Sequence, residues 1–433
     1  MRSNWWRPSR LILMASTCIL LLVSSNLNWA KDYWKGILRS DARGYYAWLP
    51  ALFIHHDLQF DFQETVENPQ TDPRHRAVYR VPVEHTYSNK YFIGTAFAEL
   101  PFFLLGHSIT LLTGGAADGY SFFYQLFINL AGIFYALAGL IFLRRLLLNM
   151  QFSEAVVSWT IVALLFASNL FYYSIIEPGM SHIYSFAFAS AFLYTIHAWL
   201  HFAHKKHLLL AAFCLGMMVL IRPVNGLLLF AIPLLGSSLS DVFARIKTAI
   251  QQGQLLFPVM LFSAIVAIQP LIWYVQTGHL FIDSYPGEDF HFLDPHVFAF
   301  LFSYKKGAFL YTPILLIALL GYGVAPKHKR PQLLYGIGWG CLLIYVLSSW
   351  WNWWYGGSFS SRVLVEFLPF FAIGLALLLQ QKLAAINVMS RALVVLCILL
   401  CQLQVYQYRY YLIHWENMTQ ERYWEVFLKT KAD

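Results

Sequence analysis

The chain has 433 residues, of which 58% are hydrophobic and only 12% are charged, and its mean hydropathy is +0.53. This balance excludes an ordinary soluble enzyme and indicates a membrane protein with many spans. The formal net charge of +8 does not indicate a nucleic-acid partner, because the basic residues fall in short clusters between apolar runs, as in Lys205-Lys206 and Lys327-His328-Lys329-Arg330.

Many of the apolar runs are continuous over about 20 residues, which is the length of a helix that crosses the hydrocarbon core. Backbone polar groups in lipid must be hydrogen-bonded internally, so helices are the expected spanning form. A β-barrel would instead show alternating segments of about ten residues. We therefore predict an all-α fold, a polytopic helical bundle surrounded by membrane lipids, with about 11 spanning helices.

The first apolar run covers residues 11 to about 27 and follows three arginines. No small-x-small cleavage site follows it, so we predict an uncleaved span with its N-terminus in the cytoplasm. Residues 29–90 would then form the first external loop. Within that loop, Asp41 lies between Arg39 and Arg43 beside an aromatic cluster, where the chain reaches water. An acid in this setting is more than a membrane anchor, and Asp41 is the leading catalytic candidate.

The next apolar run, residues 91–112, is interrupted by Glu99 and Pro101. A proline inside a helix removes a hydrogen bond and bends the chain. Counting the run as a full crossing would also place Arg144-Arg145 outside. We therefore predict two short re-entrant or juxtamembrane helices that dip into the outer leaflet, with a plain span as the alternative.

Further spans are predicted near residues 119–143, 156–175, 183–203, 207–222, 225–239, 254–275, 307–324, 332–349, 362–380 and 391–408. The basic loops between them fall on one side, which the positive-inside rule assigns to the cytoplasm. The count is then eleven spans with an external C-terminus. We expect one membrane domain over residues 1–412 and a short external tail over residues 413–433.

Three ionisable residues at the ends of these spans are candidates for an external reaction centre. Glu177 and His182 flank a Pro-Gly turn and could face one cavity, although both residue types also cap helix ends. Arg222 precedes Pro223 at the end of an apolar run. Its guanidinium suits bidentate phosphate binding, and a snorkelling arginine is the alternative.

A second candidate stretch runs from Trp350 to Glu366. Its four tryptophans, Trp350, Trp351, Trp353 and Trp354, form with Tyr355 an aromatic platform on which a sugar ring could stack. The candidates for binding the sugar or acceptor are Trp353, Trp354, Tyr355 and Glu366. The alternative is an interfacial aromatic belt, which needs no ligand. Two glycines follow the platform and allow close approach of a ligand, and Arg362 and Glu366 begin the next helix.

The loop between the predicted spans 254–275 and 307–324 is less informative. We interpret its carboxylates as a solvated loop face, with a metal-binding role as the alternative; they are Asp283, Glu288, Asp289 and Asp294. The pair Lys305-Lys306 departs from the charge rule, because it lies on the predicted outward side. Its partner could be either lipid head groups or a ligand phosphate, and the sequence does not decide between them.

In order along the chain, four motifs resemble the GT-C superfamily of polytopic glycosyltransferases: Ser40-Asp41-Ala42-Arg43-Gly44-Tyr45-Tyr46-Ala47, Asn89-Lys90-Tyr91-Phe92-Ile93-Gly94-Thr95, Glu177-Pro178-Gly179-Met180-Ser181-His182 and Trp354-Tyr355-Gly356-Gly357-Ser358-Phe359. Within that superfamily, the chain resembles a set of bacterial membrane proteins that are similar to the dolichyl-phosphate-mannose–protein mannosyltransferase and aminoarabinose transferase families. The likeness extends roughly from Leu11 to Leu379.

This resemblance implies transfer of a sugar from a polyprenyl-phosphate donor at the external face of the bacterial inner membrane, to an acceptor that the sequence does not identify. Asp41 matches the family's first-loop acid, which acts as a base or beside a divalent metal such as Mg²⁺ or Mn²⁺. The family often has two acids there, whereas Ala42-Arg43 follow Asp41 here.

Under this hypothesis Asp41 activates the acceptor hydroxyl and the reaction inverts the anomeric carbon. Arg222, Arg362 and Lys90 would stabilise the leaving phosphate, while Glu177 and His182 would orient the substrates. A transporter or flippase of a lipid-linked glycan is the alternative. Polar residues gathered on one face favour the enzyme, and polar residues spread through the bilayer favour transport.

Overall fold

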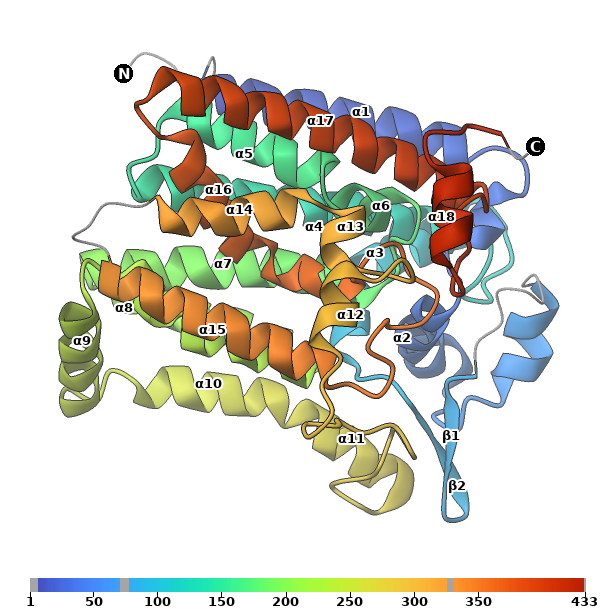
Figure 1. Cartoon of the computed structure of the whole chain (residues 1–433). Helices are drawn as coiled ribbons and strands as arrows, with labels where there is room; N and C mark the ends of the chain where they lie inside the picture. Colours follow the sequence, from blue (N-terminus) through green and yellow to red (C-terminus); the bar gives the residue numbers. More distant parts are fainter. Residues whose placement is uncertain (1–6, 71–77, 325–329, 432–433) are drawn as a thin grey trace.

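The computed structural model describes residues 7–70, 78–324 and 330–431, and its long helices lie side by side in one bundle (Figure 1). The predicted basic residues Arg2 and Lys327-His328-Lys329 lie outside the described residues. The lengthwise helices are α1 (Pro8–Asn28), α4 (Phe122–Asn149), α5 (Glu154–Phe166), α7 (Ser181–Phe202), α8 (Lys205–Ile221), α10 (Leu256–Val266), α14 (Ile314–Gly323), α15 (Arg330–Ser348), α16 (Leu368–Leu379) and α17 (Ala384–Arg409).

Shorter elements connect these helices and cover one end of the bundle. The α-helices among them are α2 (Asp41–Pro50), α6 (Leu170–Ile175), α9 (Leu239–Gln251), α11 (Ile268–Thr277), α12 (Val297–Phe302), α13 (Ala308–Tyr311) and α18 (Gln420–Val426). The 3-10 and π segments are η2 (Tyr33–Gly36), η3 (Ala51–His55), η4 (Gln63–Glu67), η5 (Asn68–Gln70), η7 (Pro223–Leu235) and η9 (Arg362–Phe367).

Strands β1 (Arg80–Val83) and β2 (Thr86–Asn89) form an antiparallel hairpin in which Arg80 pairs with Asn89. This hairpin is the only sheet in the described part of the chain. The predicted all-α membrane bundle is therefore confirmed, and the protein is an integral multi-pass membrane protein.

Eight helices of the described chain are long and apolar enough to cross a membrane, or nine if η7 and α9, which meet at 113°, count as one span. We predicted about eleven spans. Three of the predicted spans contain helices that are shorter than a full crossing. They are α5 with 13 residues in the span near 156–175, α8 with 17 residues near 207–222, and α14 with 10 residues near 307–324. They run lengthwise among the longer helices (Figure 1).

One end of the bundle is marked by a charged cluster, and we call it the Arg144 end. Here Arg144, near the end of α4, contacts Ser9 at the start of α1, with 2.5 Å from Nε to Oγ. Arg144 also pairs with Glu154 at the start of α5, at 3.1 Å. Helices α1 and α4 are thus antiparallel. The opposite end carries α2 and the hairpin, and we call it the α2 end (Figure 1).

Residues Gly94–Leu112 form one continuous helix, α3, and not the two short helices that we predicted. Pro101 lies inside it without ending it. Near its start, Gly94 packs against the backbone of Ile221 at the end of α8. After its end, the Gly119 carbonyl accepts a hydrogen bond from Tyr46 of α2. Because α1 runs toward the α2 end and α4 starts there, α3 begins and ends on the same side of the bundle.

Helix α2 is almost entirely buried and forms the floor of the α2 end. Gly44 allows this packing, because a Cβ atom there would lie 2.3 Å from Cδ2 of Tyr91. Trp48 donates a hydrogen bond to the Tyr91 carbonyl at 3.0 Å, and Asn89 donates one to the Gly44 carbonyl at 2.8 Å. These contacts hold Tyr91 beside the first turn of α2, where Asp41 lies.

Arg43 of α2 points away from that turn into the core. It pairs with Glu67, and both side chains are buried. Its guanidinium also donates to Asn68 at 3.1 Å. Arg43 is therefore a structural residue, and of the two arginines beside Asp41 only Arg39 faces the cavity described below.

The predicted C-terminal tail is folded against the rest of the protein. Tyr423 of α18 is buried and packs on Tyr304 and Tyr311, with ring centroids 5.3 and 5.9 Å away. Trp415 packs on Gly357, where a Cβ atom would lie 2.7 Å from the indole. Residues 413–431 thus form part of the α2 end.

Candidate active site

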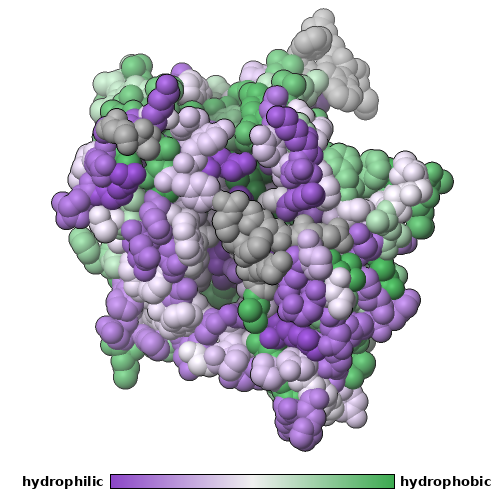
Figure 2. Space-filling view, turned by 90° about the vertical axis from the view of Figure 1, so that its right-hand side faces the viewer, coloured by the Kyte–Doolittle hydropathy of each residue, from purple (hydrophilic) through white to green (hydrophobic). Residues whose placement is uncertain are grey.

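A cavity of about 1020 Å³ opens at the α2 end and contains most of the ionisable residues singled out in the sequence. Figure 2 shows this end of the molecule, where hydrophilic residues predominate and the surface is hollowed. The lining comes from α2 with the loop before it, the β2–α3 connection, α6 with the α6–α7 connection, the end of α8, the α11–α12 loop, the segment after α15, and the end of α17 with the tail. Chain segments that are distant in sequence therefore meet in one site.

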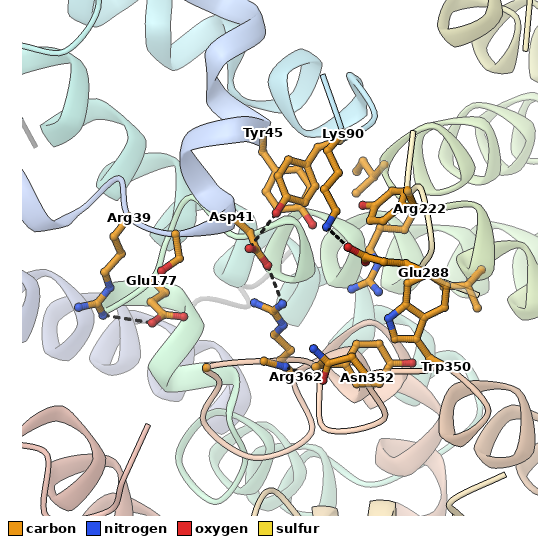
Figure 3. Close-up of a pocket in the computed structure, with 18 of the residues that line it drawn as sticks. Arg39, Asp41, Tyr45, Lys90, Glu177, Arg222, Glu288, Trp350, Asn352 and Arg362 are labelled. Carbon is orange, nitrogen blue, oxygen red and sulfur yellow. Dashed lines mark hydrogen bonds and ion pairs between the residues drawn. The ribbon is translucent and has the colours of Figure 1, made fainter. Parts of the chain in front are cut away.

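Asp41 lies near the centre of the close-up in Figure 3. It is the first residue of α2, where the helix dipole favours a negative charge. Its Oδ2 atom lies 2.6 Å from Nη2 of Arg362, and its Oδ1 atom accepts a hydrogen bond from the Tyr91 hydroxyl at 2.8 Å. Burial raises the pKa of this carboxyl, but Arg362 and Tyr91 outweigh burial and hold the pKa below its ordinary value. Asp41 is therefore an oriented, ionised carboxylate.

Arg362 reaches Asp41 from the segment that follows α15. Gly356 has φ of 66°, a backbone conformation that favours glycine, and the neighbouring Gly357 leaves space for Trp415. Ser360 also has positive φ, at 58°. These turns return the chain to the cavity wall just before Arg362, which begins η9.

Arg39 and Glu177 form a second ion pair on one side of Asp41, 3.4 Å apart (Figure 3). Glu177 also accepts a hydrogen bond from the Tyr172 hydroxyl at 2.9 Å. Burial lowers the pKa of Arg39, but Tyr172 and Glu177 outweigh it and raise the pKa above its ordinary value. Arg39 therefore stays positively charged. The Glu177 carboxylate faces the cavity, as the sequence predicts.

Arg222 lines the cavity because α8 ends just before it. Pro223 disfavours a helical conformation at Arg222, which is extended with φ −152° and ψ 117°. Behind the cavity wall, Glu366 lies 3.3 Å from Nη1 of Arg222 and 3.0 Å from Nδ1 of His182. His182 and Glu366 are 1% and 2% exposed and do not line the cavity. We expected His182 and Glu177 to face one cavity, but only Glu177 does. His182 instead contacts both Glu366 and Arg222, with 3.1 Å from its Nδ1 to Nη1 of Arg222, so His182 and Glu366 together orient Arg222.

Lys90 lies on the other side of Asp41 from Arg39 and forms an ion pair with Glu288 (Figure 3). Its ammonium lies 4.9 Å from the ring centroid of Tyr285. Glu288 belongs to the α11–α12 loop that we interpreted as a solvated loop face. That interpretation is wrong for Glu288, because the loop folds back over the cavity and brings Glu288 to Lys90.

The predicted aromatic platform is only partly in the cavity. Trp350, Trp351 and Tyr355 line it. Trp353 and Trp354 do not: Trp353 packs near His296, with ring centroids 5.9 Å apart, and Trp354 lies under the Lys305 ammonium at 3.4 Å. A turn at residues 351–354 separates the tryptophans, so neighbours in sequence face different directions.

No family model matches the chain, and no curated protein matches it. Among solved structures, the chain is similar to ArnT from Cupriavidus metallidurans bound to undecaprenyl phosphate, with a TM-score of 0.54 and 14% sequence identity. The alignment covers 94% of this chain and 65% of ArnT.

The chain has the ArnT fold. This likeness agrees with the fold that the resemblance to GT-C transferases implies. The chain spans less than two thirds of the length of ArnT. At 14% identity the comparison shows a shared architecture, and the chemistry must be argued from the cavity of this chain.

The cavity of this ArnT-like fold does not fit a tightly held divalent metal. Among the described residues, no group of three or more histidines, cysteines or carboxylates is placed to hold one. Each oxygen of Asp41 already has a partner, and Glu177 and Glu288 each pair with a cation. The chemistry below is therefore derived without a metal.

Several lining residues were missed by sequence reasoning. They are Tyr45, Tyr91, Tyr172, Tyr285, Tyr408, Arg409, Tyr411 and Trp415. Most are aromatic residues in a chain that is 18% aromatic, so composition alone does not separate them from packing residues. Tyr91 had the best signal, because it directly follows Lys90 in one of the family-like motifs.

Proposed function

We propose that this protein is a membrane glycosyltransferase that moves a sugar from a polyprenyl-phosphate-linked donor to an acceptor on the external face of a bacterial inner membrane. The observation that carries the proposal is the cavity at the α2 end, where Asp41 lies among five cationic side chains: Arg39, Lys90, Arg222, Arg362 and Arg409. Guanidinium and ammonium groups are the usual partners of phosphate. ArnT, which shares the fold, holds undecaprenyl phosphate in its structure.

The reaction would begin at the Asp41 carboxylate. Asp41 accepts the proton of an acceptor hydroxyl, and the resulting oxygen forms a bond to the anomeric carbon of the donor sugar. The bond between that carbon and the phosphate oxygen breaks, and its electron pair leaves with the polyprenyl phosphate. Attack opposite the leaving group inverts the anomeric carbon. General-base help of this kind is worth about 10²–10⁴ in rate.

The cations of the cavity would stabilise the leaving phosphate. Arg362 contacts Asp41 directly, so it could hold the base and the phosphate in one arrangement. Arg222, oriented by Glu366, and Lys90, presently paired with Glu288, would complete the phosphate site. Electrostatic stabilisation of this kind is usually the larger contribution to catalysis. Glu177 would orient the acceptor, and Trp350 with Tyr355 would contact a sugar ring.

A transporter or flippase is the other class of function considered for this chain. Transport across the bilayer calls for polar groups along the path, with binding near the midplane. Here the cavity and its paired ionisable residues lie at one end of the bundle. This placement favours a reaction centre at a membrane surface.

We assign the Arg144 end to the cytoplasm, because Arg7, Arg144 and the α7–α8 connection with Lys205-Lys206 lie there. A cysteine replacing Glu84, an exposed residue in the hairpin turn, should then react with an impermeant maleimide on intact cells. A cysteine replacing Lys206 should react only after the cells are opened. Reversed labelling would overturn the orientation.

The activity is testable without knowing the acceptor, because one product is free polyprenyl phosphate. Purified protein in liposomes would receive a panel of polyprenyl-phosphate hexoses and pentoses with a membrane lipid extract as acceptor. Mass spectrometry would follow polyprenyl phosphate and the glycosylated product. We expect one donor to be consumed, and we expect Asp41→Asn to lower the rate by about 10²–10⁴.

Asp294→Asn is the matched control, because Asp294 is an exposed acid outside the cavity lining. It should keep the wild-type rate. Equal rates for wild type and Asp41→Asn would remove Asp41 from the chemistry. Movement of an intact lipid-linked sugar across the liposome membrane, without release of polyprenyl phosphate, would favour the flippase instead.

A further inference from the structure

Lys306 is a buried lysine directly behind the cavity wall. Its side chain is 1% exposed and does not line the cavity. Among the described residues, Lys306 forms no ion pair with a carboxylate. Its neighbour Lys305, by contrast, is half-buried, and its ammonium lies over the ring of Trp354. Burying an ammonium without an ion-pair partner costs free energy, so we expect a buried lysine of this kind to have a specific role.

Two hydrogen bonds link Lys306 to the segment that precedes Arg362. Its Nζ atom donates a hydrogen bond to the Ser358 carbonyl at 2.5 Å. Its own carbonyl accepts one from the Ser361 hydroxyl at 3.3 Å. Segment 358–361 is thus attached to Lys306 at two points, just before Arg362.

This segment needs such an attachment because its backbone is unfavourable on its own. Ser360 has φ of 58°, a left-handed conformation that costs free energy for a residue with a side chain. The Tyr173 hydroxyl accepts a hydrogen bond from the Phe359 amide at 3.1 Å, and the Ser360 hydroxyl lies 3.2 Å from that of Thr312. Of these holding groups, only Lys306 carries a charge.

Lys306 also contacts a wall of the cavity. Its ammonium lies 4.7 Å from the ring centroid of Tyr408, which lines the cavity. The other charged groups that act on Lys306 are Glu177, Glu416, Arg362 and Lys305. Glu177 and Arg362 themselves line the cavity, so the charge on Lys306 is electrostatically coupled to the site.

We propose that Lys306 is a positioning residue that clamps segment 358–361, so that Arg362 is held against Asp41 in the arrangement needed for transfer. The proposal rests on the proposed function for its kinetic consequences, but the clamp itself is a statement about the structure. It predicts that the charged form of Lys306 is the active one, because an ammonium is a stronger donor to a carbonyl than a neutral amine.

The pH at which the clamp weakens follows from the surroundings of Lys306. Burial lowers its pKa to about 7, since the carboxylates Glu177 and Glu416 only partly offset the loss of hydration. The ammonium is therefore almost fully charged near pH 6 and below, about half charged near pH 7, and loses its charge as the pH rises further. The activity that depends on the clamp should fall in the same direction.

The test compares wild type with Lys306→Arg, Lys306→Met and the matched control Lys305→Met. Transfer would be measured from pH 5.5 to 9, with kcat and KM determined separately. Misplacement of a catalytic group by about 1 Å lowers the reaction rate by a factor on the order of a hundred. We expect Lys306→Met to lose at least about tenfold in kcat at pH 6 with KM within about twofold, and Lys306→Arg to abolish the decline above pH 7.

Amide hydrogen exchange at one fixed pH gives a second readout that needs no catalysis. Residues 356–362 should exchange faster in Lys306→Met than in wild type or Lys305→Met, while α4 and α7 exchange equally in all of them. An unchanged exchange rate in this segment for a folded Lys306→Met protein would overturn the clamp. So would a wild-type pH profile in both Lys306 variants.

The two proposals can fail separately. If the wild-type protein releases no polyprenyl phosphate from any donor, the proposed function fails. Hydrogen exchange alone then tests whether Lys306 holds segment 358–361 in place. If Lys306→Arg does not fold, exchange and pH dependence in Lys306→Met still decide it. Normal transfer in Lys306→Met with slower exchange of residues 356–362 would also contradict the proposal.

Discussion

Asp41 and Arg362 are separated by 321 positions in the chain, yet their side chains form an ion pair 2.6 Å long in the cavity at the α2 end. The pair is partly open to the cavity, with 26% of the Asp41 side chain and 13% of the Arg362 side chain exposed. A substrate can therefore reach both groups. This relationship between the first loop and the segment after α15 determines where the predicted chemistry occurs.

Replacing Arg362 should impair transfer more than it impairs folding. Arg362→Gln removes both the partner of Asp41 and a cation of the phosphate site, so we expect a rate loss of about 10²–10³. Arg362→Lys keeps the charge but lacks the planar fork, and it should recover only part of that loss. Release of polyprenyl phosphate is the measurement, and undiminished release by the Gln variant would contradict this role.

Removing Glu288 should strengthen binding of polyprenyl phosphate. Glu288 pairs with Lys90, and a phosphate that binds Lys90 must compete with it. A partly exposed pair of this kind is worth up to about 1 kcal/mol, so Glu288→Gln should lower the Kd by about two- to fivefold. Asp289→Asn, an acid one residue away that does not line the cavity, is the control. Isothermal titration with undecaprenyl phosphate would measure the change, and weaker binding by Glu288→Gln would exclude a competing role.

At acidic pH, the thermal stability of the protein should depend on the protonation of Asp41. Because its pKa is lowered in the folded protein, Asp41 contributes stability that is full above about pH 3.9, the usual value for aspartic acid, and is lost as the pH falls further. The difference in thermal unfolding temperature between wild type and Asp41→Asn should therefore be constant from pH 7 to about 4.5 and shrink below that. A difference that already shrinks near neutral pH would show that the pKa is raised instead.

Replacing Arg43, which lies outside the cavity lining, should lower the free energy of unfolding. Its buried pair with Glu67 would be broken by Arg43→Met, leaving a buried carboxylate without this partner, which costs about 3–5 kcal/mol. The double variant Arg43→Met with Glu67→Gln should recover part of the loss. Denaturant unfolding in detergent would measure both. A single variant as stable as wild type would argue that the pair contributes little.

The sequence located the site through its rare charged residues. Asp41, Arg222 and Arg362 stand at the ends of apolar runs, where an ionisable group is costly unless it serves a purpose, and all three line the cavity. The same reasoning correctly gave the helical membrane fold, because length and apolarity depend only on local composition.

Other features depended on contacts that local sequence does not specify. Trp353 and Trp354 lie outside the cavity because a turn redirects them, and an aromatic run has no periodicity that fixes which side chain faces a ligand. Glu288 and Tyr91 reach the site through long-range folding of loops. Residues 94–112 form one helix because the packing of its neighbours overrides the penalty of Pro101.

The packing of Trp415 against Gly357 has a consequence for how the protein is made. Arg409 at the end of α17, and Tyr411 and Trp415 after it, supply part of the cavity wall. During synthesis, Asp41 leaves the ribosome long before the residues of this wall. A partly synthesised chain therefore lacks this part of the wall, and the complete cavity can form only after residues 409–415 have been translated.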